Sequence, residues 1–504
     1  MRPHTRSISR PANNFMFSRA IMLKTGGEKM EKIIIIGGGV AGLSAGIYGL
    51  LAGLDCTVIE KNKEVGGALC SWQRGGYTVD GCLHWLTGTK RGTELYKVWQ
   101  DTGVLGLESE TVRPQTFYSS YYGGEVLDFS RDIRKTRSAM HRISPQDAHE
   151  SNAFTEAVRA AASLMGCDDS YSRMRALQLL APYARLDLYA LGRRFSSPHL
   201  HFAMTDFIGG EYNALGLIFA YAAFVSGNGD LPAGGSRGAA LRMKKKFLGL
   251  GGTLVTGTRV TGMRREGGRV VSVTTDLGDE REAEHFISCV PLPVTYRLTG
   301  GRMQSRGTRE RRKRPVFSSF HVALSADADT LPFRGTAAFA CDGVDIMGEH
   351  TDRLAIKEYS HEASFSPAGK NIIECMVFMR EDACRRWIEL RGSYNEYRDE
   401  KMRTAQLILK NAERAFPQLA GKLGIIDSWT PATFERYLGA PCGAYMGHAI
   451  TGGALPYRHG AHMRAANNLL IASGWQQAPG GLPSAACMGR RAIEYITGQH
   501  FGGT

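Results

Sequence analysis

The chain has 504 residues, of which 43% are apolar and 22% charged, and its formal net charge at pH 7 is +14. This length exceeds the size at which single hydrophobic cores stop growing, so we expect two domains that share one ligand. The basic excess suggests an anionic partner, and because no nucleic-acid-binding motif is recognisable, a membrane surface is favoured over nucleic acid. No H-E-x-x-H or P-loop motif occurs, which argues against zinc proteases and kinases.

The basic residues gather in two places. Residues 1–29 contain five Lys and Arg residues before the first acid, Glu28, and are interpreted as a disordered tail or a misassigned start, with an organelle-targeting peptide as the alternative. The run Arg306 to Arg314 is interpreted as a solvated loop, with docking to anionic lipid as the alternative.

Cysteine usage and hydropathy bear on the compartment. The ten cysteines include no C-x-x-C pair, which is typical of a reducing compartment. The longest apolar run, Ala214 to Val225, is too short to cross a membrane and is interpreted as a core helix. We therefore expect a cytoplasmic protein, with peripheral attachment to a membrane as an option.

A strand, a glycine-rich turn and a helix are predicted in succession from Ile33 onwards. Ile33 to Ile36 show no polar alternation, which is typical of a strand buried on both faces. Gly37, Gly39 and Gly42 follow with the spacing G-x-G-x-x-G. The first glycine allows a tight turn, the second the approach of a pyrophosphate, and the third close packing of the helix that begins here. The pattern indicates a dinucleotide at the helix N-terminus.

The following segment supports this interpretation. The predicted strand Cys56 to Ile59 ends at Glu60, about 20 residues beyond the glycines, where an acid binds the ribose hydroxyls and disfavours a 2′-phosphate. A strand-turn-helix unit without a ligand is the alternative. Gly66 and Gly67 then provide a second place for close backbone approach.

The succession of dinucleotide fold, acid, Gly-Gly pair and the segment Tyr77-x-x-Asp80-Gly81-x-x-His84-Trp85-Leu86 resembles the FAD-dependent phytoene desaturase and retinol saturase family. This resemblance implies that FAD is the cofactor. Further along, the turn Leu231 to Ser236, the helical Arg237 to Leu248 and the alternating segments Thr253 to Met263 and Arg269 to Thr275 resemble the family's Pro-x-Gly-Gly turn, helix and β-meander, which places Val260 beside the adenine.

The C-terminal part strengthens the resemblance. Gly443-x-x-x-Gly447 is similar to a loop of the family, and Asn468 to Trp475 is predicted to be a buried strand. Gly480-Gly481-Leu482-Pro483 opens the predicted helix Ser484 to Thr497, which in the family lies against the isoalloxazine. Together the cofactor-binding residues expected are Gly37, Gly39, Gly42, Glu60, Lys61, Gly66, Gly67, Val260, Gly474, Trp475, Gly481 and Leu482.

The expected fold class is α/β, with a Rossmann-like FAD-binding domain assembled from discontinuous segments and an α+β substrate domain with a helical cover. Helical patterns occur at Ala153 to Met165 and Arg173 to Ala190, and Ser197-Pro198 breaks them. The FAD-binding parts are residues 30–110, 225–300 and 440–504. The substrate domain comprises residues 111–224, expected to be helical, and residues 301–439, with a strand at Asn371 to Met379 and a helix at Glu396 to Phe416.

A flavin enzyme needs few catalytic side chains, because its cofactor carries the redox chemistry. His84 is the one candidate for proton handling or substrate contact, although a structural histidine is favoured. Asp80 could equally form a turn, and Tyr445 and His448 come next, with packing as their favoured role. No metal site is expected.

The leading hypothesis is an FAD-dependent oxidoreductase that adds or removes hydrogen across a carbon–carbon bond of an apolar, isoprenoid-, carotenoid- or retinoid-like substrate. A flavin-dependent polyene isomerase without net redox is the runner-up. An amine oxidase is disfavoured because no Arg follows Gly67, and a non-catalytic isoprenoid-binding flavoprotein is a further alternative. With a single dinucleotide motif, the electron partner is open among quinone, oxygen, a reductase and transient nicotinamide.

Overall fold

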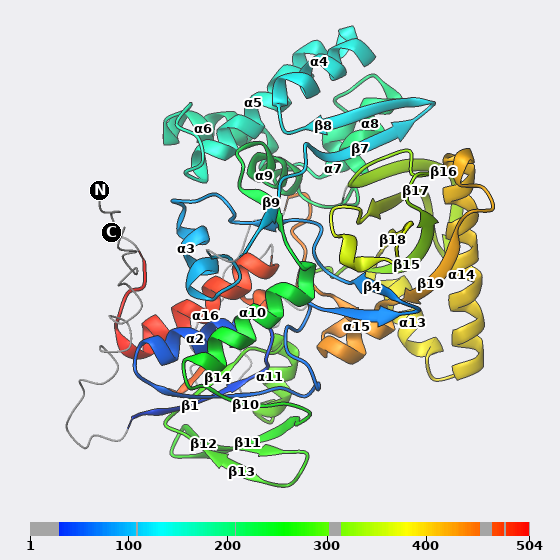
Figure 1. Cartoon of the computed structure of the whole chain (residues 1–504). Coiled ribbons are helices and arrows are strands. Elements are labelled where there is room, and N and C mark those ends of the chain that lie inside the picture. The colour runs from blue at the N-terminus through cyan, green and yellow to red at the C-terminus, as the bar shows by residue number, and fades with distance from the viewer. Residues whose placement is uncertain are drawn as a thin grey trace, which may run out of the picture.

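The computed structural model describes residues 30–106, 109–206, 208–301, 314–453, 466–477 and 480–502. Figure 1 shows three regions: a parallel sheet with its helices at the lower left, a mixed sheet at the right, and a group of helices at the top. The tail 1–29 and all but the last residue of the run 306–314 lie outside the described residues.

Five strands form the first sheet: β1 (Lys32–Ile36), β2 (Asp55–Ile59), β10 (Thr253–Val255), β14 (His285–Ser288) and β20 (Leu469–Ile471). Their order is β10-β2-β1-β14-β20 and all neighbours are parallel. Ile33 and Ile35 belong to the hydrophobic cluster on one face, whereas Ile34 and Ile36 belong to the cluster on the other. Burial on both faces explains the lack of polar alternation, so the prediction for this strand is confirmed.

Three helices cover one face of this sheet: α2 (Val40–Leu51), α10 (Gly235–Gly249) and α16 (Leu482–Thr497). The antiparallel strands β11 (Val260–Glu266), β12 (Arg269–Thr275) and β13 (Glu280–Glu282) and the helix α11 (Leu292–Leu298) lie on the other side. The predicted Rossmann-like sheet with a β-meander is confirmed. One detail is wrong, because residues 253–255 pair with β2 in the parallel sheet and do not begin the meander.

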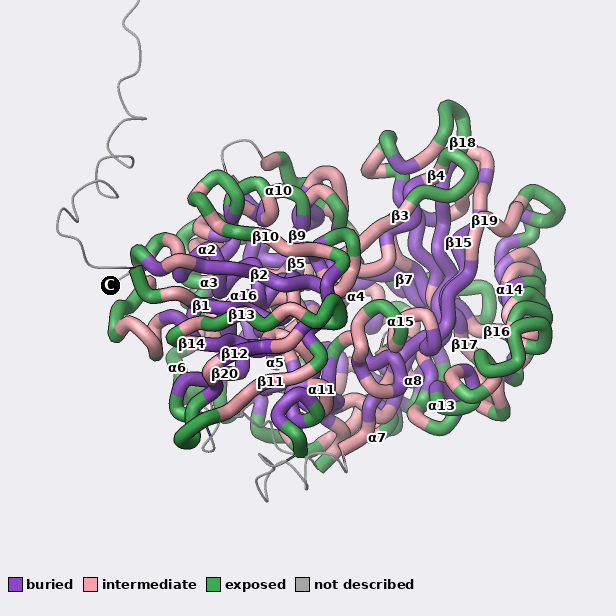
Figure 2. Tube along the Cα trace, turned by 90° about the horizontal axis from the view of Figure 1, so that it is seen from below, coloured by how far each residue is buried: buried purple, intermediate pink, exposed green. Residues whose placement is uncertain are grey.

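Seven strands form the mixed sheet: β7 (Thr116–Tyr122), β8 (Glu125–Ser130), β15 (Ser318–Asp327), β16 (Thr336–Ile346), β17 (Glu349–Glu358), β18 (Lys370–Met379) and β19 (Gly424–Trp429). The order is β19-β15-β18-β17-β16-β7-β8, and only β16 and β7 are parallel neighbours. The helices α13 (Glu381–Leu390) and α14 (Tyr394–Ala415) pack on one face. Figure 2 shows β15 and β18 in the colour of buried residues.

Six helices form the cover: α4 (Ile133–Ile143), α5 (Ala148–Leu164), α6 (Arg173–Leu180), α7 (Leu188–Gly192), α8 (Pro198–Thr205) and α9 (Ala214–Val225). The expectation that residues 111–224 are helical is partly wrong, because the hairpin of β7 and β8 lies among them. The predicted helix over residues 173–190 is interrupted near Pro182, which has no N–H to donate. Ser197 caps α8 by accepting from the Leu200 N–H, so Ser197-Pro198 begins a helix.

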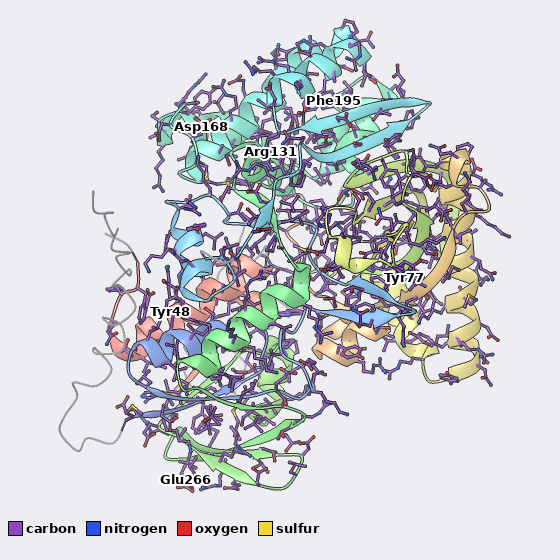
Figure 3. The ribbon with its side chains drawn as sticks, in the orientation of Figure 1. Tyr48, Tyr77, Arg131, Asp168, Phe195 and Glu266 are labelled. Atoms are coloured by element: carbon purple, nitrogen blue, oxygen red, sulfur yellow. The ribbon has the colours of Figure 1, made fainter. Side chains whose placement is uncertain are left out.

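Short elements join these regions: β3 (Ser71–Arg74), β4 (Tyr77–Asp80), β5 (Leu86–Thr87), α3 (Glu94–Asp101), β6 (Thr111–Val112), β9 (Gly229–Pro232) and α15 (Pro431–Leu438). Arg131, labelled in Figure 3, connects the cover to β9. Its guanidinium donates to the buried carboxylate of Asp230 at 3.0 Å and to the Phe224 carbonyl at 2.8 Å. This contact fixes the position of the cover.

Candidate active site

A cavity of about 800 Å³ lies where the two sheets and the helical cover meet. All the predicted cofactor-binding residues line it except Gly42, which lies behind the glycine turn. A Cβ atom on Gly42 would come within 1.8 Å of the Gly37 carbonyl oxygen. The third glycine is therefore required for close packing of helix and turn, as the motif predicts.

Glu60 follows β2 directly, and hydrogen bonds from Gly38 and Asn62 hold its carboxylate in place. Its Oε2 accepts from the Gly38 N–H at 2.7 Å, and its Oε1 accepts from the backbone and side-chain nitrogens of Asn62, each at 2.8 Å. A carboxylate offers about four acceptor positions, so one is left for a ribose hydroxyl. Lys61 also lines the cavity, but its ammonium donates to the Arg436 carbonyl, which fastens the end of β2 to α15.

Gly66 and Gly67 bring a second stretch of backbone against the first turn. The Gly66 N–H donates to the Gly38 carbonyl at 2.9 Å. Both glycines have positive φ, 117° and 61°, which other residues rarely adopt. A Cβ atom on Gly67 would lie 3.1 Å from Gly39 Cα. These close contacts place the two backbone segments side by side along the wall of the cavity.

The end of the chain closes the same cavity. Ser44 Oγ on α2 donates to the Ala486 carbonyl on α16 at 2.7 Å, across 442 positions of sequence. Ser44 has the G-x-S-x-G spacing of a hydrolase nucleophile, yet it is fully buried inside α2. A Cβ atom on Gly480 would come within 2.2 Å of the Met446 carbonyl oxygen, so this glycine turn also needs its lack of side chain. The N-terminus of α16, beginning after Gly481, borders the cavity.

These residues fit FAD, because turns that only glycine can make surround the cavity and two helix N-termini border it. When bound, FAD supplies the redox chemistry of its isoalloxazine ring. The protein's part is to bind, orient and shield the reactants.

The mixed sheet forms the floor of the rest of the cavity. Residues paired across neighbouring strands make one transverse row, from His321 through Met376, Ala355 and Ala338 to Ser120. Residues directly opposite each other in a sheet share a face, and the first four of these line the cavity. The row is mostly apolar, and its alanines leave room above the sheet. The opposite wall includes Leu215 and Phe219 of α9.

A chain of polar side chains crosses the end of this floor. The Tyr445 hydroxyl lies 3.0 Å from Ser319 Oγ, which in turn contacts His321 Nε2. His321 Nδ1 contacts Glu374 Oε1, and the Tyr359 hydroxyl donates to Glu374 Oε2 at 2.6 Å. We name these five residues the Tyr445–Tyr359 relay. Tyr445 and His321 line the cavity, so the relay leads from the cavity into the sheet.

With the geometry described, comparison with known proteins decides the family. A profile of flavin-containing amine oxidoreductases matches residues 40–497. The chain belongs to the flavin-containing amine oxidoreductase family. The flavoprotein is an oxidoreductase, and FAD is its cofactor.

Two curated relatives of this flavoprotein are a phytoene dehydrogenase and a 4,4'-diapolycopene oxygenase. The phytoene dehydrogenase of Streptomyces griseus is 23% identical, with 93% of this chain and 96% of that protein covered. The 4,4'-diapolycopene oxygenase of Methylomonas sp. is 26% identical over 51% of this chain, and the chain spans 55% of that relative.

Solved structures share the fold. An oxidoreductase from Methanosarcina mazei has a TM-score of 0.61 at 14% identity, covering 93% of this chain and 100% of that one. A double mutant of putrescine oxidase has a TM-score of 0.60 at 16% identity, covering 93% and 99%.

His84 lines the cavity of the flavoprotein, in line with its selection from the sequence. Burial and the nearby positive charge of Lys357 lower its pKa to about 3, although Glu374 acts in the opposite direction. His84 is therefore neutral at physiological pH and can accept a hydrogen bond but not supply a charge.

Of the other candidates from the sequence, Asp80 and His448 make structural contacts and Tyr445 belongs to the relay. Asp80 is buried and accepts from the backbone N–H groups of Cys82, Leu83 and Ser236, so it orders the loop that carries His84. His448 lies against the Trp475 ring and contacts the Arg314 carbonyl. Tyr445 alone joins the relay.

Sequence reasoning missed Ser319, His321 and Glu374. The serine and histidine alternate on one strand in a pattern common to any strand, and the glutamate lies 53 positions beyond the histidine. Only the pairing of β15 with β18 brings them together.

Within the described residues, no helix is long and apolar enough to span a membrane. The same part of the chain holds no group of three or more His, Cys, Asp or Glu side chains placed to bind a metal ion.

Proposed function

We propose that the flavoprotein adds or removes hydrogen across a carbon–carbon bond of a long, apolar, isoprenoid-like substrate. The observation that carries the proposal is the apolar floor, which continues from the FAD-lining residues across the mixed sheet. A hydrocarbon gains roughly 25 cal/mol for each Å² it removes from water in such a cavity. The names of the phytoene dehydrogenase and diapolycopene oxygenase relatives point to the same class of substrate.

We assign the proton of this reaction to the Tyr445–Tyr359 relay. Loss of hydride from a polyene leaves a delocalised cation, which then gives up a proton. Tyr445 accepts this proton at its hydroxyl oxygen and passes its own to Ser319, which passes its own to His321 Nε2. The resulting imidazolium lies against the Glu374 carboxylate. Saturation uses the same path in reverse.

Glu374 suits this role because its carboxylate is held ionised. Burial acts to raise its pKa, but the contacts with His321 and the hydrogen bond from Tyr359 bring the pKa below its ordinary value. A buried carboxylate beside His321 stabilises a proton arriving on the imidazole.

The test is an anaerobic reaction of the FAD-loaded protein with phytoene. Bleaching of the flavin absorbance supports hydrogen removal, and recolouring of pre-reduced protein by a more unsaturated polyene supports saturation. A product of unchanged mass would show isomerisation instead. Hydrogen peroxide release with amines, or binding of polyenes without any spectral change, would also contradict the proposal.

We further propose that the flavoprotein contacts an anionic membrane surface through α6. Met174 is 68% exposed and Leu177 is 48% exposed, and Arg173 and Arg175 lie beside them. A basic residue near an anionic surface contributes about 1 kcal/mol.

Sedimentation with vesicles that contain phosphatidylglycerol tests the membrane contact. The double variant Met174→Asp, Leu177→Asp should lose binding. Leu277→Asp is the matched control, because Leu277 is 73% exposed and lies between β12 and β13 in the sequence. Figure 1 shows these two strands far from α6. Equal binding of both variants would contradict the proposal.

A further inference from the structure

The cavity has a second polar end at Asp206, which follows α8 directly. This side chain is 3% exposed. Its Oδ2 accepts a hydrogen bond from Ser120 Oγ at 2.7 Å, and the Tyr118 hydroxyl also acts on the carboxyl group. Its Oδ1 is buried and lies within hydrogen-bonding geometry of no donor among the described residues. A buried polar atom without a partner is costly, so an acceptor or donor from outside the chain is expected here.

The sheet register fixes how far this end lies from the relay. Ser120 is the last residue of the transverse row that begins at His321, four strands away. Strands are about 4.8 Å apart, so the two ends of the row are separated by roughly 19 Å. The floor between them is Met376, Ala355 and Ala338, which offer no side-chain hydrogen bond to a substrate.

The protonation of Asp206 decides what it can bind. Burial raises its pKa to about 8, against the hydrogen bonds from Ser120 and Tyr118 and the charge of Arg353, which lower it. At neutral pH the carboxyl group is mostly protonated. A protonated carboxyl group both donates and accepts a hydrogen bond, which matches a hydroxyl or carbonyl oxygen.

We propose that Asp206 binds a terminal hydroxyl or carbonyl oxygen of the substrate. The substrate is then an isoprenoid alcohol or aldehyde, with roughly 19 Å of apolar chain between its oxygen and the relay. This inference rests on the proposed function, because that function sets the reacting bond at the FAD end of the cavity.

An amine is a poor match for this end of the cavity. The Arg353 guanidinium contacts Thr205 Oγ1, next to Asp206 in the chain, and its charge acts on the Asp206 carboxyl group. A substrate ammonium would face this positive charge. The neutral carboxyl group would give it no compensating ion pair.

The test is a titration of the FAD-loaded, full-length protein with three probes of equal chain length. They are geranylgeraniol, the hydrocarbon with a methyl group in place of its terminal CH₂OH, and geranylgeranylamine. The change in tryptophan fluorescence gives Kd, because Trp85 and Trp475 line the cavity. We expect the alcohol to bind about 10- to 100-fold tighter than the hydrocarbon.

Variants connect this preference to Asp206. Asp206→Leu should abolish it, and Asp206→Asn should retain most of it, because an amide also donates and accepts. Asp128→Leu is the control at the surface: Asp128 is exposed and accepts from Ser119 Oγ at 2.6 Å, and neither residue lines the cavity. Flavin content and Tm check that each variant is folded, and the comparison of probes on the unaltered protein holds even where a variant does not fold.

Equal affinity for alcohol and hydrocarbon in the unaltered protein overturns the inference, as does tighter binding of the amine. A preference that survives in Asp206→Leu also overturns it. The two proposals fail separately. An Asp206-dependent preference without turnover of any polyene would leave the subsite and remove the oxidoreductase function, whereas turnover without the preference would do the reverse.

Discussion

His84 lies in the cavity as a neutral imidazole, and the charges of Lys357 and Glu374 act on its pKa. The Lys357 ammonium contacts the Leu83 carbonyl, one residue before His84. The loop is thus held from both sides, by Lys357 and by Asp80. We therefore expect His84 to contact the substrate without being required to hold FAD.

Replacing His84 by Ala should slow flavin reduction by substrate about tenfold or more, because a group positioned at the reacting atoms contributes at least this factor. The FAD content should stay unchanged. Stopped-flow single-turnover reduction measures the rate, with His350→Ala, an exposed histidine on the β16–β17 hairpin, as control. A rate equal to that of the unaltered protein would remove His84 from the mechanism.

The relay makes a second prediction. Glu374→Gln keeps the shape of the side chain but removes the charge against His321, so single-turnover reduction should slow by about 100-fold with FAD still bound. Tyr359→Phe removes the other hydrogen bond to Glu374 without interrupting the path to Tyr445, and should have a smaller effect. If flavin reduction in Glu374→Gln is as fast as in Tyr359→Phe, the relay does not carry the proton.

Asp206 also predicts a pH dependence of stability. Its pKa is about 8 in the folded chain and near 3.8 as a model value, so between these values the folded state binds more protons than the unfolded state. Stability contributed by this group is therefore complete at low pH and is lost as the pH rises towards 8, by about 1.4 kcal/mol per pH unit. Urea unfolding of Asp206→Asn should lack this part of the slope. Parallel pH curves for both proteins would contradict the assigned protonation.

For single residues, the sequence predicts those roles that depend on a fixed spacing along the chain. Gly37, Gly39 and Glu60 have roles that follow from fixed positions around one strand-turn-helix unit. His321 and Asp206 have roles that depend on which strands pair and which helix ends beside them, and no short pattern records this.

Among the elements, α16 and α2 are packed so closely that their contact is made by backbone. A Cβ atom on Gly489 would lie 2.4 Å from the Ala41 carbonyl oxygen and 2.7 Å from the Ala45 nitrogen. Both helices direct their N-termini to the cavity, so their separation sets the width of the FAD site.

Gly489→Ala should push these helices apart, lower Tm and reduce the FAD retained on purification. Overpacking of this kind costs about 1–3 kcal/mol. Gly249→Ala is the matched control, because a Cβ atom there meets nothing within 4 Å. Full flavin content in Gly489→Ala would show that the helices can move apart without loss of the site.

Helices and strands could be predicted where the residues of the element alone define it. The apolar run Ala214–Val225 forms a helix with the predicted bounds. The hairpin of β7 and β8 was missed although its two-residue turn, Gly123-Gly124, has the positive φ values of a tight hairpin turn and is a local signal. Its pairing with β16, more than 200 residues further along the chain, has no local signal.

In the whole molecule, each sheet is built from segments far apart in the sequence. The parallel sheet takes strands from residues 32–59, 253–255, 285–288 and 469–471, and the mixed sheet takes its strands from the intervals between them. The family resemblance predicted this division, but the exact meeting of the two sheets at the cavity follows from packing. Neither half can complete its sheet before most of the chain is present.

FAD should therefore stabilise the whole chain and not one region. A ligand at 100 times its Kd adds about 2.7 kcal/mol to the free energy of unfolding. Calorimetry of FAD-free and FAD-loaded protein should show one transition that moves upward on loading. Two transitions, of which only one responds to FAD, would show that the sheets unfold independently.

The transverse row also has a consequence for the evolution of substrate length. Each strand adds one fixed increment of distance, and at Ala338 and Ala355 a single methyl group is all that stands above it. A larger residue at either position would block the floor at that increment, so one codon change could convert the protein to shorter substrates. We therefore expect the number of strands that the substrate crosses to set the length of substrate that the cavity accepts.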